Sequence, residues 1–294
     1  MGDRPGRAAM RILVTGAGGQ VGSEVAAHLA HHDTVALDRV ALDICDRTRV
    51  EQTMGSILPD AVVNCGAWTD VDGCEADPER AYLTNALAVR HLAVAAARIG
   101  AHVVHVSTDY IFAGDQEEPY REWDRPDPRS VYGRSKLGGE LELMAHARSW
   151  ALVRTSWVFG RRGRNFVDTI LARGRQGGPL SVVTDQRGCP TYAADLAGVL
   201  ARLATGRHQG VFHVTNQGAC TWHELARATL ELAGLDPVVV GETTSAALDR
   251  PAPRPANSVL ADTALAAVGL SRLRPWREVL EARLTAPVAL ESRT

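Results

Sequence analysis

A glycine-rich segment near the start of the chain, ILVTGAGGQVGSEV, limits the possible folds more than any other feature. Gly16, Gly19 and Gly22 stand between a short apolar run and a helical pattern. Small residues at this spacing let the chain turn tightly, bring the backbone close to a pyrophosphate and pack a helix against a strand. The N-terminus of that helix offers N–H groups and a partial positive charge. The segment therefore predicts a dinucleotide-binding strand–loop–helix unit.

Short apolar runs then alternate with helical patterns along the first two thirds of the chain. The runs are rich in valine and too short for helices, which is typical of strands buried on both faces of a parallel sheet. They lie at residues 11–16, 34–38, 61–65, 102–108, 151–156 and 211–216. This alternation predicts an α/β fold, a Rossmann-like doubly wound parallel sheet.

Two helices have clear end signals. Asp77 suits an N-cap, Pro78 the first helical position and Gly100 the stop, which predicts a helix between them. Thr221 and Glu224 have the spacing of a capping box. Trp222, directly after this cap, is expected in the core.

Composition changes after about residue 158, where Arg, Gly and Pro-rich loops become frequent. We expect residues 10–158 to form the NAD(P)-binding Rossmann domain, with residues 192–217 returning to it. Residues 159–191 and 218–294 are expected to form a smaller C-terminal substrate-binding lobe. Such a lobe would lie over the carboxyl ends of the strands, where ligands bind in open α/β sheets.

Charge and cysteine content exclude several classes of protein. The net charge of −2 argues against nucleic-acid binding, and no 18-residue apolar stretch predicts a membrane span. The start of the sequence does not have the pattern of a secretory signal. No close C-x-x-C pair predicts a zinc or disulfide framework, and we expect no metal site and a cytoplasmic protein. The cysteines are Cys45, Cys65, Cys74, Cys189 and Cys220.

The second predicted strand ends in Asp38, which follows Gly22 by 16 positions. A carboxylate here can accept hydrogen bonds from the adenosine ribose, which favours NADH. Arg39 comes next and could accommodate the 2′-phosphate of NADPH. The residues leave the choice between NADPH and NADH open. Asp43 and Ile44 could flank the adenine, although a plain loop role fits them equally well.

Tyr132 and Lys136 are one helical turn apart in the segment VYGRSKLGGE. A neighbouring ammonium would lower the pKa of the phenol from about 10 and ease proton exchange. Thr108, at the end of a predicted strand, could hydrogen-bond a substrate carbonyl. The three residues together predict a proton-delivery set for carbonyl reduction. Gly138 and Gly139 are costly inside a helix, which indicates either close packing or a frayed helix end.

Several motifs make the chain similar to a known family. Besides the glycine loop and VYGRSKLGGE, the sequence contains VVNCGAWTDVDGCE, VSTDYIFAG, VRTSWVFG, RNFV, TDQRGCPTY and RPANSVL. With these it resembles the extended short-chain dehydrogenase/reductases and, within them, the dTDP-4-dehydrorhamnose reductase family. Tyr-x-x-x-Lys marks only the superfamily, whereas the tryptophan of RTSWVFG and the segment DQRGCPT are typical of the sugar-nucleotide reductase branch.

The resemblance implies a role for each matching residue. Tyr132 would donate the proton with Lys136 as its helper, Thr108 and Asp109 would bind the substrate carbonyl region, and Trp157 would contact the sugar. Trp68 departs from the smaller or imidazole side chains expected at its position. The cofactor would contact Gly16, Gly19, Gln20, Val21, Gly22, Asp38, Asp43, Ile44, Ala67, Trp68, Thr69, Val106, Tyr132 and Lys136.

The implied reaction is NAD(P)H-dependent reduction of the 4-keto group of dTDP-4-dehydro-β-L-rhamnose to dTDP-L-rhamnose, a step of dTDP-rhamnose biosynthesis. The alternatives are a ketoreductase for another dTDP-deoxysugar and a non-catalytic relative like the regulatory beta subunit of methionine adenosyltransferase. The resemblance implies a monomer or homodimer, and some family members bridge Mg²⁺ with acidic side chains. Arg161, Arg162, Arg164 and Arg254 suit either a substrate pyrophosphate or a solvated loop.

Overall fold

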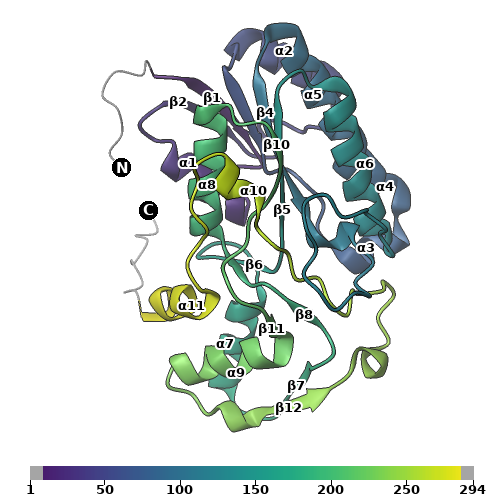
Figure 1. The fold of residues 1–294 in the computed structure, drawn as a ribbon, viewed down its shortest axis with the longest axis vertical. Helices are drawn as coiled ribbons and strands as arrows, with labels where there is room; N and C mark the ends of the chain where they lie inside the picture. Colours follow the sequence, from purple (N-terminus) through teal and green to yellow (C-terminus); the bar gives the residue numbers. More distant parts are fainter. Residues whose placement is uncertain (1–8, 286–294) are drawn as a thin grey trace.

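A computed structural model describes residues 9–285 of the chain. At its centre lies a six-stranded sheet, in which every neighbouring pair of strands is parallel. Figure 1 shows the sheet edge-on in the upper part of the molecule. The predicted fold class is confirmed. In spatial order the strands are β10 (Gly210–His213), β5 (Trp150–Thr155), β4 (His102–Thr108), β3 (Ala61–Asn64), β1 (Arg11–Thr15) and β2 (Asp33–Leu37).

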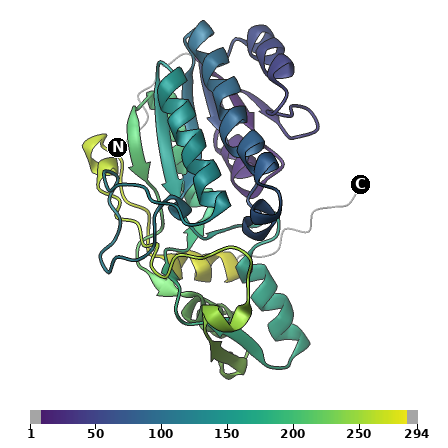
Figure 2. The ribbon, with the colours of Figure 1, turned by 90° about the vertical axis from the view of Figure 1, so that its right-hand side faces the viewer.

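Helices cover both faces of this sheet. α1 (Gln20–His28) and α8 (Ala193–Gly206) pack on one face, where the valines and leucines of both helices meet the sheet. On the other face lie α2 (Arg47–Ile57), α5 (Ala88–Ile99) and α6 (Val131–His146), the last two in front of the sheet in Figure 2. Because both faces are covered, the inner strands β1, β3, β4 and β5 are buried along most of their length.

The lower part of the molecule is built from short strand pairs and helices (Figure 1). β6 (Val158–Phe159) pairs with β9 (Thr191–Tyr192), β7 (Leu180–Val183) with β12 (Val240–Thr243), and β8 (Arg187–Gly188) with β11 (Cys220–Thr221). The helices are α7 (Phe166–Gln176), α9 (Trp222–Leu232) and α11 (Trp276–Thr285), and the short elements are η3 (Pro237–Val239) and η4 (Ser245–Leu248). The short helix α10 (Ala264–Ala267) lies beside α8 in the upper part, where Leu265 joins the core of the sheet. After β9 the chain returns to the upper sheet through α8 and β10. It then re-enters the lower part, where it forms β11, α9 and β12.

The helix predicted between Pro78 and Gly100 has both predicted ends but is not regular. Asp77 accepts a hydrogen bond from the N–H of Arg80, and Gly100 closes the C-terminus at φ +73°. Between α4 (Pro78–Tyr82) and α5, residues Leu83–Leu87 form a π-helical segment, η1. Such widened turns are rare and frequently occur at functional sites. The periodicity of the sequence did not reveal this interruption.

Gly138 and Gly139 are explained by the approach of α6 to this segment. A Cβ on Gly139 would overlap the carbonyl oxygen of Asn85, and one on Gly138 would lie 3.0 Å from the Cβ of Ala86. The helix continues unbroken to His146, so the frayed-end interpretation is wrong. The glycines allow α6 and η1 to pack at backbone distance.

We therefore expect Gly139→Ala to destabilise the protein by about 1–3 kcal/mol, because it must push two backbones apart. Gly138→Ala is the matched control. Its methyl group would lie 3.0 Å from the Cβ of Ala86 and overlap no backbone atom, and the gain in helix propensity of about 1 kcal/mol offsets this crowding. Urea unfolding of both variants measures the difference. A Gly139→Ala variant as stable as the control would contradict the close approach of the two helices.

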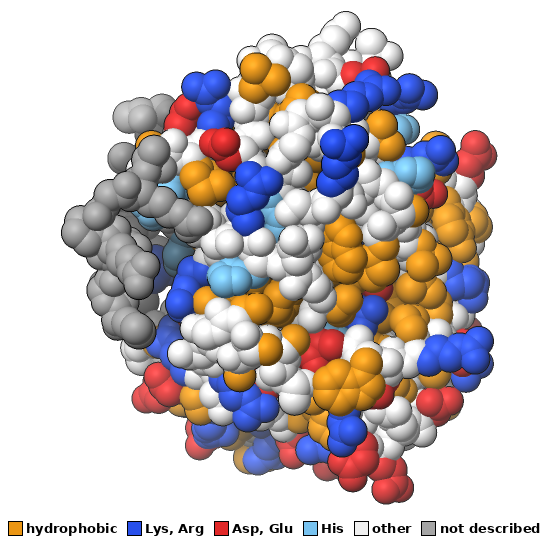
Figure 3. Space-filling model, turned by 45° about the horizontal axis from the view of Figure 1, so that its top comes forward, with side chains coloured by type: hydrophobic (Ala, Val, Ile, Leu, Met, Phe, Trp, Pro, Cys, Tyr) orange, Lys and Arg blue, Asp and Glu red, His pale blue; other side chains and the backbone are white. Residues whose placement is uncertain are grey.

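Exposed apolar side chains gather on the helical face around η1 and α6. Tyr82, Leu83, Leu87, Leu141 and Met144 are each at least one-third exposed. In Figure 3, hydrophobic side chains form a patch on the side where α4, α5 and α6 lie in Figure 1.

Within residues 9–285, no helix has both the length and the apolar character needed to cross a membrane.

Candidate active site

A cleft of about 340 Å³ lies at the carboxyl ends of β1, β2 and β3. Seven of the sixteen residues that line it were predicted to hold the cofactor: Gly16, Gly19, Asp38, Asp43, Ile44, Ala67 and Trp68. Arg39 also lines it, and so do Gly18, Val40, Leu42, Cys45, Cys65, Gly66, Arg80 and Thr84. The cleft therefore has the lining expected of the adenosine and pyrophosphate end of a dinucleotide site.

The glycine loop has the geometry that a phosphate requires. Gly16 adopts φ +68°, and a Cβ there would lie 2.7 Å from the backbone nitrogen of Gly66. A Cβ on Gly22 would overlap the carbonyl oxygen of Gly16. α1 begins at Gln20 without a side-chain cap. Its first N–H groups are thus suited to a bound anion, and the loop fits a dinucleotide pyrophosphate.

Asp38 has a structural role in addition to the one predicted. Its Oδ1 accepts hydrogen bonds from the N–H groups of Val40, at 3.0 Å, and Ala41, at 2.9 Å. These bonds order the turn after β2, where Arg39 lies. Contact with ribose hydroxyls therefore depends on the second carboxylate oxygen of Asp38.

The other predicted cofactor residues lie outside the lining of this cleft. They are Gln20, Val21, Gly22, Thr69, Val106, Tyr132 and Lys136. Gln20 donates from Nε2 to the carbonyl oxygen of Arg164 at 3.2 Å and so ties the glycine loop to the loop at 161–164. Thr69 is exposed beyond Trp68. Val106 accepts a hydrogen bond from Lys136 and so belongs to the reacting centre.

Trp68 is held by a residue that the sequence analysis missed. Asn85, in η1, accepts from the N–H of Trp68 at 2.8 Å and donates to its carbonyl oxygen at 3.0 Å. The same amide donates to the hydroxyl of Ser135 in α6 at 3.0 Å. The guanidinium of Arg80 lies 4.2 Å above the Trp68 ring. The only signal for Asn85 was a polar residue within an otherwise apolar helix pattern.

Tyr132, Thr108 and Asp109 are in mutual contact. The N-cap Ser130 starts α6, accepting from the N–H of Gly133 at 3.1 Å, and this places Tyr132 in the first turn. The Tyr132 phenol lies beside the Thr108 hydroxyl, which opposes the rise in the phenol's pKa that burial causes. Thr108 in turn donates to Asp109 Oδ1 at 2.9 Å. The structure thus brings together the predicted proton donor and the predicted carbonyl-binding residues.

Lys136 does not act on the Tyr132 phenol as predicted. Burial raises the pKa of Tyr132 above its ordinary value, so the prediction of a lowered phenol pKa is wrong. The ammonium of Lys136 instead donates to the carbonyl oxygen of Val106 at 2.7 Å. Burial lowers the pKa of Lys136 to about 8, against the attraction of Glu140. A phenol kept protonated at neutral pH suits a proton donor.

Thr108 has less freedom than the sequence suggested. Its single proton is directed at Asp109, so donation to a substrate carbonyl requires that bond to break. Asp109 itself is 2% exposed, at the start of η2 (Asp109–Ile111). Burial raises the pKa of its carboxyl to about 6, although hydrogen bonds oppose the shift.

Trp157 stacks on Trp222, with ring centroids 3.6 Å apart and planes within 8°. Trp157 has a left-handed φ of +46°, and a Cβ on Gly188 would lie 2.5 Å from its indole ring. The indole N–H of Trp222 donates to Gln186 at 3.1 Å. The motifs RTSWVFG and DQRGCPT thus meet at one place. Trp222, expected in the core, is a half-buried partner of the predicted sugar-contacting residue.

The arginines proposed for the substrate pyrophosphate differ in position. Arg254 forms a bidentate ion pair with Asp72 of α3 (Val71–Ala76), with distances of 2.7 and 2.6 Å. This arginine is therefore engaged in holding the loop around it. Arg161, Arg162 and Arg164 lie in an exposed loop that contacts Gln20.

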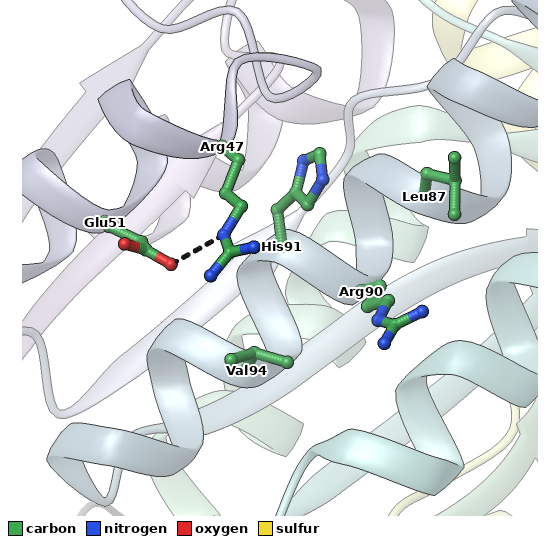
Figure 4. Close-up of a pocket in the computed structure, with 6 residues that line it drawn as sticks. All are labelled: Arg47, Glu51, Leu87, Arg90, His91 and Val94. Atoms are coloured by element: carbon green, nitrogen blue, oxygen red, sulfur yellow. Dashed lines mark hydrogen bonds and ion pairs between the residues drawn. The ribbon is translucent and has the colours of Figure 1, made fainter.

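A second hollow, of about 400 Å³, lies between α2 and α5 on the outer face of the helix layer (Figure 4). Arg47 donates to Glu51 at 2.9 Å along α2, and His91 bonds the carbonyl oxygen of Ile44. None of the predicted site residues line it. Across the described part of the chain, no three His, Cys, Asp or Glu side chains are grouped to hold a metal ion.

Comparison with known proteins now identifies the family. Residues 10–288 match the family described as the RmlD substrate binding domain. The chain belongs to this family. A dTDP-4-dehydrorhamnose reductase of Mycobacterium tuberculosis is 43% identical over 285 residues, which cover 94% of this chain and 93% of that protein. The predicted family is confirmed.

Two further proteins are similar to this chain over most of its length. A probable dTDP-4,6-dihydroxy-2-methyloxan-3-one 4-ketoreductase of Streptomyces antibioticus is 44% identical over 277 residues, covering 92% of this chain and 93% of that one. A dTDP-4-dehydrorhamnose reductase of Bacillus anthracis, crystallised with NADP, has a TM-score of 0.91 at 36% identity and covers 94% and 99% of the two chains. Both relatives are named as reductases, which favours an enzyme over the regulatory alternative.

Proposed function

We propose that the protein reduces the 4-keto group of dTDP-4-dehydro-β-L-rhamnose with NADPH or NADH and forms dTDP-L-rhamnose. The observation that carries the proposal is the Tyr132–Thr108 contact beside Lys136, at the end of β4 and on the same edge of the sheet as the glycine-lined cleft. Relatives named for this activity share more than 40% of its sequence.

The residues of the chain divide the chemistry between them. When bound, the dihydronicotinamide supplies the hydride. Tyr132 gives its proton to the ketone oxygen, and its buried surroundings keep that proton in place until charge develops on the oxygen. Lys136, anchored on the carbonyl oxygen of Val106, holds the cofactor ribose beside the phenol. Trp157 provides an aromatic surface for the sugar.

We also propose a division of the chain into two parts. Residues 10–158 with 192–217 carry the cofactor, and residues 159–191 with 218–294 carry the sugar nucleotide. Residues 286–294 lie outside the described residues. A cytoplasmic location, the choice between monomer and homodimer, and the use of Mg²⁺ stay predictions.

The activity is tested by mixing the purified protein with NADPH or NADH and enzymatically generated dTDP-4-dehydro-L-rhamnose. We expect the absorbance of the reduced cofactor to fall as dTDP-L-rhamnose forms. Oxidation of neither cofactor would contradict the proposal. The Streptomyces antibioticus relative favours one further candidate, a ketoreductase for another dTDP-deoxysugar. Faster turnover of a different 4-keto sugar in the same assay would select it.

Arg39 is expected to set the preference for NADPH. It lines the adenosine cleft on the turn ordered by Asp38. A hydrogen bond to a charged group contributes about 1.5–3 kcal/mol, so Arg39→Ala should raise KM for NADPH roughly 10–100-fold and leave KM for NADH nearly unchanged. Arg80→Ala, which removes the other cleft arginine, is the control. If KM rises by the same factor for NADPH and for NADH in both variants, Arg39 has no selective role.

A further inference from the structure

Trp157 lies at the reacting edge of the sheet in an unusual backbone conformation. It follows Thr155, the last residue of β5, by two positions, and Thr155 pairs with Thr108 at the end of β4. The φ of Trp157, +46°, is in the left-handed region, where a bulky side chain is an outlier. Backbone strain of this kind persists only where the surroundings enforce it, and it clusters at ligand and active sites. The contacts of the Trp157 ring show what enforces it here.

Both flat faces of the Trp157 indole are covered. The Trp222 ring lies parallel to one face, with ring centroids 3.6 Å apart. A Cβ on Gly188 would lie 2.5, 2.7 and 2.8 Å from three adjacent ring atoms of Trp157, Cε2, Nε1 and Cζ2. Such similar distances to neighbouring atoms place Gly188 over the plane of the ring. Because the stacked Trp222 ring leaves no room on its own side, Gly188 lies on the opposite face.

This arrangement explains the glycine in the segment DQRGCPT. Gly188 does not have a positive φ, so its backbone conformation does not require glycine. The Trp157 ring is what excludes a side chain at this position. Trp157 is still partly exposed although both its faces are covered, so its accessible part is the edge of the indole.

Trp222 is in turn held by residues of the lower part of the molecule. Its indole N–H donates to Oε1 of Gln186 at 3.1 Å, and the Gln186 amide donates to the hydroxyl of Ser245 at 2.8 Å. The Phe166 ring packs against the Trp222 ring, with centroids 4.5 Å apart. A capping box fixes the start of α9, where Trp222 is the first residue. The position of the Trp222 ring is therefore determined before any ligand binds.

We propose that Trp222 and Gly188 are positioning residues that clamp Trp157, so that the edge of its indole recognises the hexose of a nucleotide sugar. This inference rests on the proposed reductase activity. The edge of an aromatic ring is its electropositive part, so it suits the oxygen atoms of a sugar, whereas an open face would suit C–H groups. A ring that is already ordered also loses no rotamer freedom when the sugar binds, which preserves affinity.

Substitutions on the two faces test the clamp independently. Trp222→Leu keeps an apolar side chain but removes the stacked ring, and Gly188→Ala pushes a methyl group into the other face. We expect each change to raise KM for dTDP-4-dehydro-L-rhamnose about tenfold, the upper end of what an aromatic pair contributes. The kcat at saturating substrate and the Kd for NADPH should stay close to the wild-type values. Trp222→Phe restores a stacked ring and should recover most of the loss.

Binding without turnover separates positioning from a general structural role. dTDP-L-rhamnose and dTDP differ by the sugar alone. In calorimetric titrations we expect Trp222→Leu and Gly188→Ala to weaken the binding of dTDP-L-rhamnose about tenfold and to leave the binding of dTDP unchanged. Trp276→Leu is the matched control, because Trp276 belongs to the same hydrophobic cluster but lies against Gly218. It should leave both Kd values unchanged.

The stacked pair also has a spectroscopic signature. Two parallel indoles in contact couple electronically, so Trp222→Leu should remove a circular dichroism signal that Trp276→Leu retains. Wild-type KM and Kd values in both Trp222→Leu and Gly188→Ala would overturn the clamp. An equal loss of dTDP and dTDP-L-rhamnose binding would also overturn it, because that result indicates a structural role. If Trp222→Leu does not fold, Gly188→Ala decides. A wild-type protein that oxidises neither NADPH nor NADH contradicts the proposed function instead, and the comparison of the two ligands still judges the clamp.

Discussion

Replacing Tyr132 with phenylalanine should lower kcat by a factor of about 10²–10⁴, which is the usual contribution of a positioned proton donor. The phenylalanine ring preserves the packing in the first turn of α6, where Tyr132 is almost fully buried. Only the hydroxyl beside Thr108 is removed. Cofactor binding should persist, because the glycine loop and the adenosine cleft do not involve the phenol. Steady-state kinetics and fluorescence titration with NADPH measure the two effects.

Tyr110 provides a matched control for this variant. Its ring meets the Tyr132 ring edge-on, with centroids 5.5 Å apart, and burial raises its pKa as well. Tyr110→Phe removes a phenol from the same cluster without touching Thr108. We expect it to retain most of the turnover. Activity in Tyr132→Phe equal to that of Tyr110→Phe would remove Tyr132 from the mechanism.

The sequence predicted the cofactor end of the site well because local patterns determine it. A strand, a glycine turn and a helix N-terminus are consecutive in the chain. Because the next strand is parallel, it ends at the same edge of the sheet, and the acidic residue at its end lies near the glycine turn. Asp38 and Gly16 therefore line the cleft as expected. Each predicted strand lies within three residues of its position in the structure, because its run of apolar residues is short and has clear ends.

The sequence predicted which residues form the reacting centre but not how they contact one another, because these contacts join distant segments of the chain. The direction of the Thr108 hydroxyl depends on Asp109, and the position of Trp68 depends on Asn85 in a π-helical segment. The stacking of Trp157 on Trp222 joins residues 65 positions apart. Periodicity and capping signals describe single elements and cannot reveal how two of them meet.

A buried ion pair beneath the reacting centre leads to the second large effect. Glu140 lies one turn beyond Lys136 on α6 and is completely buried, while Arg154 of β5 is 4% exposed. Arg154 donates to Glu140 through Nε at 3.1 Å and Nη2 at 2.8 Å. The Ser107 hydroxyl donates to the same carboxylate at 2.5 Å. With these donors the carboxylate is well satisfied despite its burial.

Arg154→Met should therefore lower the free energy of unfolding by about 3–5 kcal/mol, because it leaves the Glu140 carboxylate buried without its cation. Adding Glu140→Gln should recover a large part of this loss, since the uncompensated charge is gone. Arg47→Met, which breaks an exposed pair with Glu51, should cost less than about 1 kcal/mol. Urea unfolding of the four proteins, wild type included, measures these differences. A cost for Arg154→Met no larger than that for Arg47→Met would show that water reaches Glu140, and the same water would then compete for the ammonium of Lys136.

Glu140 also opposes the lowering of the Lys136 pKa by burial. The Glu140→Gln change should therefore lower that pKa further and shift the basic limb of NADPH binding to lower pH.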